Sequence, residues 1–416
     1  MTYFQPSSIL CFKNGFGLWT LDFRLYFVLK TVRLMIVAGE ASGDAHAAAL
    51  VETLRGIAPN INFEFFGLTG VKMRASGVET IVRADDLAII GLLEIGRALP
   101  RFWRVFQTLK QTARGRKPDA VVFVDFPDFN LPLVKSLKKL GLKTIYYVSP
   151  QLWAWRSYRV RNIRRNVDLL LTILPFEKDW YRQRGFERVE FIGHPLVGAV
   201  RAKFGREEFC RRHDLQTENP IVALLPGSRG KELSKILPPM LEAAAILFQK
   251  NPTIQFIITV APTRRREEIE GIINVAREKG LNLPNIVVVE NETREALAAS
   301  DAAAVASGTA TLETALIGTP LVVCYKVSRH NWHALRHLIS VPHYGLVNLI
   351  AGERLAVELI QDDLNGEKLA AELKKLLQPE TNRRMRERLT EITATLGAGG
   401  ASEKAARAIL RELKTN

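Results

Sequence analysis

Two carboxylates near residue 125 have the residue types and setting of a general base. The run from Ala120 to Val124 (AVVFV) is typical of a buried strand, and the segment DFPDFN follows it directly. A carboxylate partly removed from water between aromatic side chains has a raised pKa and can accept the proton of a hydroxyl group. We expect Asp125 to be this base. Asp128 is instead the expected cap of a helix that begins near Asn130, because Pro127 prevents an earlier helical turn, and a part in the site is the alternative.

A glycine-bounded turn in the second half of the chain is suited to a phosphate. The apolar run Ile221–Leu225 (IVALL) ends in Pro226-Gly227-Ser228-Arg229-Gly230. The guanidinium of Arg229, next to Ser228, offers a planar fork for two phosphate oxygens and keeps its charge, which suits a departing diphosphate. A solvent-facing arginine beside a tight turn is the alternative. The segment lacks the glycine spacing and the Gly-Lys-Ser/Thr ending of a Walker A loop.

A second turn in the same half has features of a nucleotide site. The run Ala302–Ala306 leads into Ser307-Gly308-Thr309-Ala310-Thr311-Leu312-Glu313 and then into a helix. Hydroxyls and free N–H groups at a helix start suit a diphosphate, and Glu313, one turn into the helix, is able to bind ribose hydroxyls. Ordinary capping of the helix by Ser307 or Thr309 is the alternative.

The first half of the chain has a loop of the same design. The run Arg33–Ala38 (RLMIVA) ends in GEASGD, which contains Gly39, Glu40, Ser42, Gly43 and Asp44. In open α/β sheets, ligands bind outside the carboxyl ends of strands, where glycine admits close backbone approach and a helix offers unpaired N–H groups. We expect these residues to line a binding site. Two such halves facing each other would join two substrates across a cleft.

The histidines give weaker signals. His194 in Gly193-His194-Pro195 follows an apolar run and precedes a charged stretch, so it is expected to face the cleft, with a structural hydrogen bond as the equal alternative. His330, His333 and His337 have metal-like spacing in the last pair. No HExxH arrangement accompanies them, so no metal site is predicted and their role stays unassigned.

The elements that must position these residues are apolar runs alternating with helix-like segments. Between residues 33 and 201 the runs are RLMIVA, FEFFG, AVVFVD, TIYYV, LLLTI and VEFIG, and after residue 220 they are IVALL, IQFIITV, NIVVV, AAAVA and PLVVCYKV. This alternation predicts parallel sheets built from right-handed βαβ crossovers. The predicted fold class is α/β, with two Rossmann-like parallel-sheet domains that face a cleft.

The ends of the chain differ from these two halves. Since Met35 lies inside the first expected strand, the start of translation stays open. The charged, helix-rich tail is broken at Gly397–Gly400, and such a terminal helix could lie back on the first domain. The expected parts are an N-terminal extension (1–32), the first domain (33–201), a charged link without strand signal (202–219), the second domain (220–378) and the helical tail (379–416).

Composition limits the class of partner. The net charge of +15, from 58 Lys and Arg against 43 Asp and Glu, favours nucleic acid, an anionic membrane or phosphorylated substrates. Nucleic acid is not predicted, because the aromatic and basic stretch Tyr146–Arg165 carries no recognition motif. Cys11, Cys210 and Cys324 lie far apart without CxxC spacing, which predicts a reduced, cytoplasmic protein. The apolar stretch Ile9–Leu29 is interrupted by charges and lacks the cleavage pattern of a signal peptide.

One segment suggests contact with a membrane. Leu87–Arg104 (LAIIGLLEIGRALPRFWR) is strongly apolar, contains a tryptophan and has basic residues within and after it. These features favour a helix that lies in a membrane interface and is attracted by anionic lipid. A core helix of the first domain is the alternative.

Eight segments, in order from about Met35 to the tail, together resemble one known family. They are AGEASGD, FVDFPDFN, YYVSPQLWAWR, LPFEK, FIGHP, LLPGSRGKE, ASGTATLE and LVNLIAG, and in them the chain is similar to the lipid-A-disaccharide synthases of lipid A biosynthesis. The resemblance implies an inverting, metal-independent glycosyltransferase of the B fold without a cofactor. Its reaction would transfer 2,3-diacylglucosamine from the UDP conjugate to the 6-hydroxyl of 2,3-diacylglucosamine 1-phosphate, giving a β-1,6 disaccharide and UDP.

The resemblance also implies roles for individual residues. Asp125 would deprotonate the acceptor hydroxyl, Arg229 would act at the diphosphate, and the loop Gly39–Asp44 would line the acceptor side. Peripheral attachment to the cytoplasmic face of the inner membrane would fit Leu87–Trp103, because both substrates carry acyl chains. The oligomeric state stays open. The implied UDP-sugar contacts in the second domain are Thr309, Ala310, Thr311, Glu313 and Asn348.

Two other functions compete with this one. A transferase or 2-epimerase acting on soluble UDP-N-acetylglucosamine would share the fold and the UDP turn, but would have no use for the apolar segment Leu87–Arg104. A binding module without activity, held to membrane or nucleic acid by its basic face, would leave the acids of DFPDFN unexplained and would not bind UDP.

Overall fold

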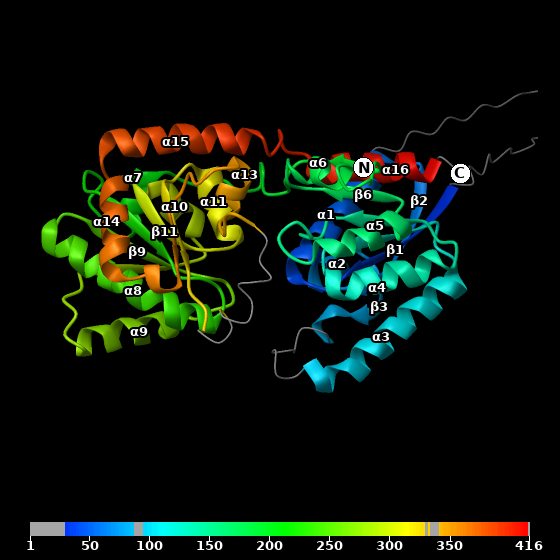
Figure 1. Ribbon diagram of the computed structural model, residues 1–416, viewed down its shortest axis with the longest axis horizontal. Coiled ribbons are helices and arrows are strands. Elements are labelled where there is room, and N and C mark those ends of the chain that lie inside the picture. Colours follow the sequence, from blue (N-terminus) through cyan, green and yellow to red (C-terminus); the bar gives the residue numbers. More distant parts are fainter. Residues whose placement is uncertain (1–29, 87–94, 329–331, 333–340, 415–416) are drawn as a thin grey trace, which may run out of the picture.

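The computed structural model describes residues 30–86, 95–328, 332 and 341–414, which form two parallel sheets covered by helices. Figure 1 shows them as two lobes side by side. We call the seven-stranded sheet with its helices the first lobe and the six-stranded sheet with its helices the second lobe. The predicted α/β class with two Rossmann-like units is confirmed.

The first sheet has the strand order β3-β2-β1-β4-β5-β6-β7, with all neighbours parallel. The order reverses between β1 and β4, and ligands bind at such a switch point, outside the carboxyl ends of the strands. The Gly39 loop follows β1 and Asp125 follows β4, so the topology brings these two predicted site segments together. The strands are β1 (Lys30–Ala38), β2 (Ile61–Thr69), β3 (Glu79–Arg83), β4 (Ala120–Val124), β5 (Thr144–Tyr147), β6 (Leu169–Thr172) and β7 (Val189–Phe191).

The second sheet repeats this arrangement with the order β10-β9-β8-β11-β12-β13. Its switch point lies between β8 and β11. The Arg229 turn follows β8 and the Ser307 turn follows β11, so they too are neighbours. The strands are β8 (Ile221–Leu225), β9 (Gln255–Val260), β10 (Ile286–Glu290), β11 (Ala302–Ala306), β12 (Leu321–Tyr325) and β13 (Glu358–Ile360).

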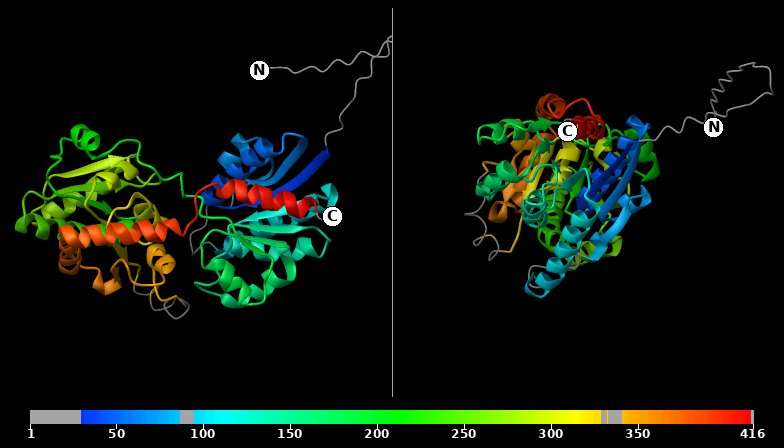
Figure 2. Two further views of the ribbon diagram at one scale, coloured as in Figure 1. Left: turned by 90° about the horizontal axis from the view of Figure 1, so that it is seen from above. Right: turned by 90° about the vertical axis from the view of Figure 1, so that its right-hand side faces the viewer.

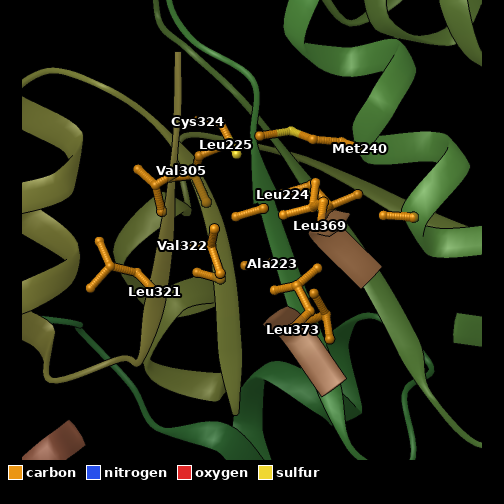
Figure 3. Packing of buried hydrophobic residues seen from close by; sticks show 14 of the residues in the cluster. Ala223, Leu224, Leu225, Met240, Val305, Leu321, Val322, Cys324, Leu369 and Leu373 are labelled. Carbon is orange, nitrogen blue, oxygen red and sulfur yellow. The ribbon is translucent and has the colours of Figure 1, made fainter. Parts of the chain in front are cut away.

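Helices cover both faces of each sheet, which explains why strands such as β4, β8 and β11 are buried over their whole length. In Figure 3, Leu224 and Val322 of the second sheet lie among Met240, Leu369 and Leu373 from the helices. In the first lobe the helices are α1 (Ala41–Ile57), α2 (Val71–Ala75), α3 (Ile95–Arg116), α4 (Pro127–Lys138), α5 (Val160–Asn166) and α6 (Glu177–Arg182). In the second they are α7 (Arg206–Arg212), α8 (Gly230–Lys250), α9 (Arg266–Glu278), α10 (Thr293–Ala299), α11 (Thr309–Ile317), α13 (Leu346–Ala351) and α14 (Gly366–Leu376).

The predicted link 202–219 is not a bare connection. It contains α7, whose Phe209 and Cys210 are buried against Ile221 and Ile257 of the second sheet. Most of this segment therefore packs as part of the second lobe. The absence of a strand pattern did not reveal the short helix.

The tail holds the two lobes together. Helix α15 (Pro379–Ala394) packs on the second lobe, whereas α16 (Ala401–Lys414) packs on α1 of the first lobe. In the left view of Figure 2, α15 lies along the second lobe and α16 along the first, so the chain crosses between the lobes where these two helices join. The backbone amide of His194 donates to the carbonyl of Leu396 over 2.9 Å, so the two connections between the lobes meet there. The expectation that a terminal helix lies back on the first domain is confirmed for α16.

Contact of the apolar segment 87–104 with a membrane stays a prediction, and residues 87–94 of it lie outside the described part of the chain. Helix α3 contains the rest of the segment. It extends further, to Arg116, and buries Val105, Leu109 and Ala113 in the first-lobe core. Its other face leaves Trp103 63% exposed. Among the described helices, none combines the length and the apolar character required to cross a bilayer.

Candidate active site

Asp125 lies where β4 turns into α4, and its backbone is unusual. Asp125 and Phe126 have φ angles of 46° and 49°, a left-handed conformation that non-glycine residues rarely adopt. Two hydrogen bonds to the carbonyl of Asp125 hold the turn, from Asn130 Nδ2 at 2.8 Å and from the Tyr146 hydroxyl at 2.7 Å. The fully buried Asn130 and Tyr146 therefore fix the position of a half-buried carboxylate.

The surroundings of Asp125 raise the pKa of its carboxyl toward neutrality. Burial, and to a smaller extent the negative charge of Glu40, raise the pKa of Asp125 from 3.8 to about 6. A carboxyl with a pKa near 6 is ionised at pH 7 and more basic than an ordinary aspartate. This is the property predicted for a base that accepts a hydroxyl proton.

The loop that follows β1 lies against this turn. A Cβ atom at Gly39 would collide with the ring of Phe126, so only glycine allows the two turns to approach so closely. Glu40 and Ser42 are exposed, whereas Gly43 is buried against the carbonyl of Val124. The structure therefore leaves Glu40 and Ser42 accessible and gives Gly39 and Gly43 a packing role.

The side chain of Asp44 binds backbone amides. Its carboxylate is buried and accepts hydrogen bonds from the amides of Gly70 at 2.9 Å, Lys72 at 2.8 Å and Met73 at 3.0 Å. These are the first amides of α2, so Asp44 caps that helix from a distant part of the chain. Although Asp44 borders a cavity, a structural role accounts for both of its oxygens.

The Asp44→Ala variant is expected to lose about 3 kcal/mol of unfolding free energy, because charge-assisted hydrogen bonds are broken and buried amides lose their acceptor. Urea denaturation measures the loss. Glu52, an exposed acid on the same helix α1, supplies the matched control Glu52→Ala, which should change stability by less than about 0.5 kcal/mol. Equal midpoints for the two variants would contradict the capping role.

His194 is buried in the first lobe and its Nδ1 accepts a hydrogen bond from the amide of Leu196 at 3.2 Å. Burial, and to a smaller extent nearby His46, lower the pKa of His194 to about 4. The pKa of His46 is lowered by burial and by the charge of Lys72. The structure thus gives His194 the structural hydrogen bond that was one of its two expected roles. His46, five residues after Ala41, was not singled out from the sequence, and its only signal is its place after the GEASGD loop.

The predicted capping role of Asp128 is wrong. Helix α4 begins at Pro127, whose fixed φ and missing N–H suit the first helical position, so Asp128 already lies in the first turn. Its exposed carboxylate pairs instead with Arg156 at 2.9 Å and Arg159 at 2.6 Å. Asp128 therefore joins α4 to the 3-10 turn Ser157–Arg159 at the edge of the site.

Most of the aromatic stretch that begins in β5 is core. Tyr146 and Tyr147 are fully buried, and the indole N–H of Trp153 donates to the buried carboxylate of Glu177 at 3.0 Å. These side chains do not form an exposed platform for bases.

Arg229 is a strongly exposed residue of the predicted site in the second lobe. It occupies the N-cap position of α8, its side chain is 82% exposed, and one guanidinium nitrogen lies 3.2 Å from Glu232. The preceding Gly227 has a φ of 109°, which places this turn in a conformation that favours glycine. The neighbouring Ser228 is exposed, and its carbonyl accepts a hydrogen bond from Thr263.

The turn after β11 leaves the start of α11 open. No described side chain caps the helix, since Ser307 Oγ donates to the carbonyl of Tyr344 and Thr309 is exposed. The expected alternative of capping by Ser307 or Thr309 is therefore wrong. Thr311 is buried and bonds to the carbonyl of Gly308. Burial raises the pKa of Glu313, half-buried one turn further on, although the charge of Arg294 opposes this.

These two turns share a cavity of about 670 Å³ in the second lobe. Arg201, Lys203 and Arg294, which the sequence did not single out, add positive charge to it. Arg201 and Lys203 come from the connection between the lobes, so no motif surrounds them. The predicted site residues in its wall are Ser228, Arg229, Ser307, Gly308, Thr309, Ala310 and Glu313.

The predicted contact of Asn348 with the substrate is contradicted. Asn348 is fully buried in α13, and its amide donates to the Ala356 carbonyl and to Glu358 while its oxygen accepts from the Ala356 amide. The carboxylate of Glu358 in turn accepts hydrogen bonds from the backbone amides of Tyr344 and Gly345. Asn348 therefore supports the loop that Ser307 contacts.

A second cavity, of about 1270 Å³, lies in the first lobe beside Gly39, Glu40 and Phe126. Arg229 borders this cavity as well as the one in the second lobe. The two switch points thus face each other through Arg229. Within the described residues no three His, Cys, Asp or Glu side chains gather as a metal site, and His330, His333 and His337 lie outside that part of the chain.

Solved structures with this architecture include sugar-nucleotide enzymes. UDP-GlcNAc 2-epimerase from Neisseria meningitidis, bound to UDP-GlcNAc, is 11% identical with a TM-score of 0.56, covering 93% of this chain and 100% of that one. The calicheamicin glycosyltransferase CalG4 is 14% identical with a TM-score of 0.57, covering 93% and 99%. At these identities the likeness shows the glycosyltransferase B fold alone.

Sequence relatives are more specific. The lipid-A-disaccharide synthase of Syntrophus aciditrophicus (strain SB) is 44% identical over 382 residues, 92% of this chain and 98% of the relative. That of Myxococcus xanthus (strain DK1622) is 42% identical, covering 92% and 97%. The family model for lipid-A-disaccharide synthetase matches residues 34–411. With a match of this length and relatives of this identity, the chain belongs to the lipid-A-disaccharide synthase family.

Proposed function

We propose that Asp125 and Arg229 carry out the transfer by which this enzyme joins UDP-2,3-diacylglucosamine to 2,3-diacylglucosamine 1-phosphate, forming the β-1,6 disaccharide 1-phosphate and UDP. The observation that carries the proposal is the position of Arg229, which borders the cavities of both lobes. A group at that junction is able to act on the diphosphate of a donor while the other lobe presents the acceptor.

The first lobe would supply the base. Asp125 is held by its own backbone hydrogen bonds, and its raised pKa makes the ionised carboxylate a stronger base at neutral pH. In the transfer, Asp125 accepts the proton of the acceptor 6-hydroxyl as that oxygen bonds to the anomeric carbon. Attack opposite to the departing UDP inverts the configuration.

The second lobe would hold the donor. The uncapped start of α11 offers amide N–H groups to the diphosphate, and Glu313 is placed one turn further on for the ribose hydroxyls. Arg229, Lys203 and Arg294 bring positive charge to the same cavity. Charge that develops on the departing UDP is stabilised there without moving water.

The first lobe would also rest on the cytoplasmic face of the inner membrane. Exposed Trp103 on α3 and the net positive charge of the chain support this part of the proposal. Both substrates carry acyl chains that would lie in the bilayer, so an enzyme at the bilayer surface can bind them there.

The decisive assay measures UDP release from UDP-2,3-diacylglucosamine with and without the acylated acceptor. The proposal expects UDP only with the acceptor and a disaccharide product in equal amount. Conversion of soluble UDP-N-acetylglucosamine without any acceptor would favour a 2-epimerase instead. Failure to bind UDP would favour the module without activity.

The pH profile is expected to reflect Asp125. Because a base must be ionised, kcat/KM should fall tenfold per pH unit below the pKa of about 6 and level off above it. A steady-state series from pH 5 to 8.5 measures this, with UDP binding at each pH as the control for the donor site. A flat profile down to pH 5 would contradict the assignment.

A further inference from the structure

We infer that the first-lobe cavity is an acyl-chain site, which holds one fatty acyl chain of the acceptor while its sugar lies at Asp125. The inference rests on the proposed function and adds a subsite to it. The cavity measures about 1270 Å³, above the roughly 300–1,000 Å³ of common small-molecule pockets. A sugar phosphate alone has no need of a space this large.

One part of the cavity wall is a cluster of aromatic side chains. Phe129 of α4 lies at the centre, with ring centroids 6.0 Å from Phe102, 6.3 Å from Phe106 and 5.6 Å from Phe126. Phe102 and Phe106 come from α3, so α3 and α4 together form this part of the wall. Aromatic rings that meet one another around a space, rather than filling it, suit a flexible hydrocarbon.

The mouth of the cavity exposes large apolar side chains to solvent. Val71 is 65% exposed and Trp103 is 63% exposed, and both belong to the cavity wall. Trp103 stacks on Phe106 with ring centroids 5.8 Å apart, so the exposed ring continues the aromatic wall. Exposed apolar side chains that join an apolar cavity indicate a nonpolar ligand that enters there.

Polar groups border the cavity where a glycolipid head group is required. Glu40 and Gly39, next to the base turn, belong to the wall, and so do the cations Lys72 and Arg156. The wall also contains Asp44, Asp85 and Asp128, whose carboxylates already bind backbone amides or arginines. Arg156 also pairs with Asp128, whereas Lys72 has an exposed side chain. The wall therefore combines charged groups with aromatic side chains, as a sugar phosphate with an attached acyl chain requires.

The placement favours the acceptor over the donor as the source of the chain. Apart from Arg229, the described residues of the wall come from the first lobe, and Phe126 is the residue directly after the proposed base. The nucleotide features lie in the other cavity. A chain from a bilayer gains little free energy on entering a protein cavity, so the site mainly avoids exposing that chain to water when the head group reaches Asp125.

Photolabelling tests the site directly on the full chain. The acceptor with a diazirine at the end of one acyl chain is expected to label peptides of α3 and α4, and unlabelled acceptor should compete. The same diazirine chain is tested in the UDP donor and in phospholipid vesicles. Equal labelling by the phospholipid would reduce the cavity to a membrane contact, and labelling by the donor alone would assign it to the other substrate. Either result overturns the inference.

Kinetics supply a second readout. The variants Trp103→Ser and Phe106→Ala are expected to lower kcat/KM at least tenfold for a long-chain acceptor, yet less than twofold for a soluble acceptor with two-carbon acyl groups. Tyr158→Ala is the matched control, because Tyr158 is an exposed aromatic residue of the same lobe outside the cavity wall. The kcat/KM of this control variant should stay within twofold of the wild-type value for both acceptors. For each variant, UDP affinity checks that the donor site is intact, and the midpoint of thermal unfolding checks that the protein is folded.

Equal losses for long and short acceptors, or no loss for either, would overturn the acyl-chain site while leaving the transferase intact. If the wild-type protein formed no disaccharide from either acceptor, the proposed function itself would fail. The two failures are therefore distinguishable.

Discussion

Turnover is expected to fall at least about 100-fold when Asp125 is replaced by asparagine, the scale on which loss of a general base lowers rates. The amide has the shape of the carboxyl but takes up no proton. The turn should persist, because Asn130 and Tyr146 bind the backbone carbonyl of residue 125 and not its side chain. UDP affinity should be unchanged. Single-turnover measurements at pH 7.5 check the result.

The same variant is expected to be more stable than the wild type at neutral pH. Folding raises the pKa of Asp125, so the folded state binds more protons than the unfolded state between about pH 4 and 6. The free energy of unfolding therefore falls as pH rises through that window, and the deficit is complete above pH 6. Asparagine removes up to about 3 kcal/mol of this deficit at pH 8 and almost none at pH 4.

Asp128→Asn is the matched control, because it makes the same chemical change three residues away on an exposed side chain. It breaks surface ion pairs and should change stability by less than about 1 kcal/mol. Near wild-type turnover in Asp125→Asn would remove Asp125 from the base role. A loss of activity together with lower stability at pH 8 would point to a disturbed turn.

Arg229→Ala is expected to lower kcat by about 100-fold to 1,000-fold, the effect of removing one group that stabilises developing charge. Arg229→Lys should restore only part of this, because an ammonium lacks the planar fork. Free UDP should bind within a few-fold of wild type, since the effect belongs to the departing diphosphate. Comparing kcat with UDP affinity separates a loss of transition-state stabilisation from a loss of donor binding.

The second lobe contains a closely matched control for Arg229. Arg265 occupies the N-cap position of α9, is also 82% exposed, and also lies near a glutamate three residues on, but it is not part of either cavity wall. Arg265→Ala should leave kcat unchanged. Equal effects at both positions would reduce Arg229 to a surface charge.

The fold followed from the sequence because the strands are buried on both faces. Runs such as AVVFV and IVALL are continuous apolar segments, which mark central parallel strands without reference to the rest of the chain. The loops after these strands were also predictable as sites, since strand order in such sheets brings carboxyl ends together. Asp125, Arg229 and the Ser307 turn all lie at these ends.

Roles that depend on distant partners were not predictable. Asn348 has a polar side chain in a segment of the family pattern, but Glu358 and Ala356 take all of its hydrogen bonds. Asp44 caps a helix that begins 27 residues later. Pro127 was interpreted as a helix breaker, although at the first helical position it starts α4. Local spacing does not show which backbone amides a carboxylate will meet.

The chain crosses between the lobes twice, and the meeting of His194 with Leu396 places both crossings side by side. Two adjacent crossings can form a hinge, because they let the lobes rotate about one axis and oppose rotation about the others. Gly193 and Gly397, with φ angles of 85° and 95°, lie in these crossings, one in each. Sliding of one lobe past the other would be opposed by such a hinge, which would keep Arg229 at the border of both cavities while the lobes rotate.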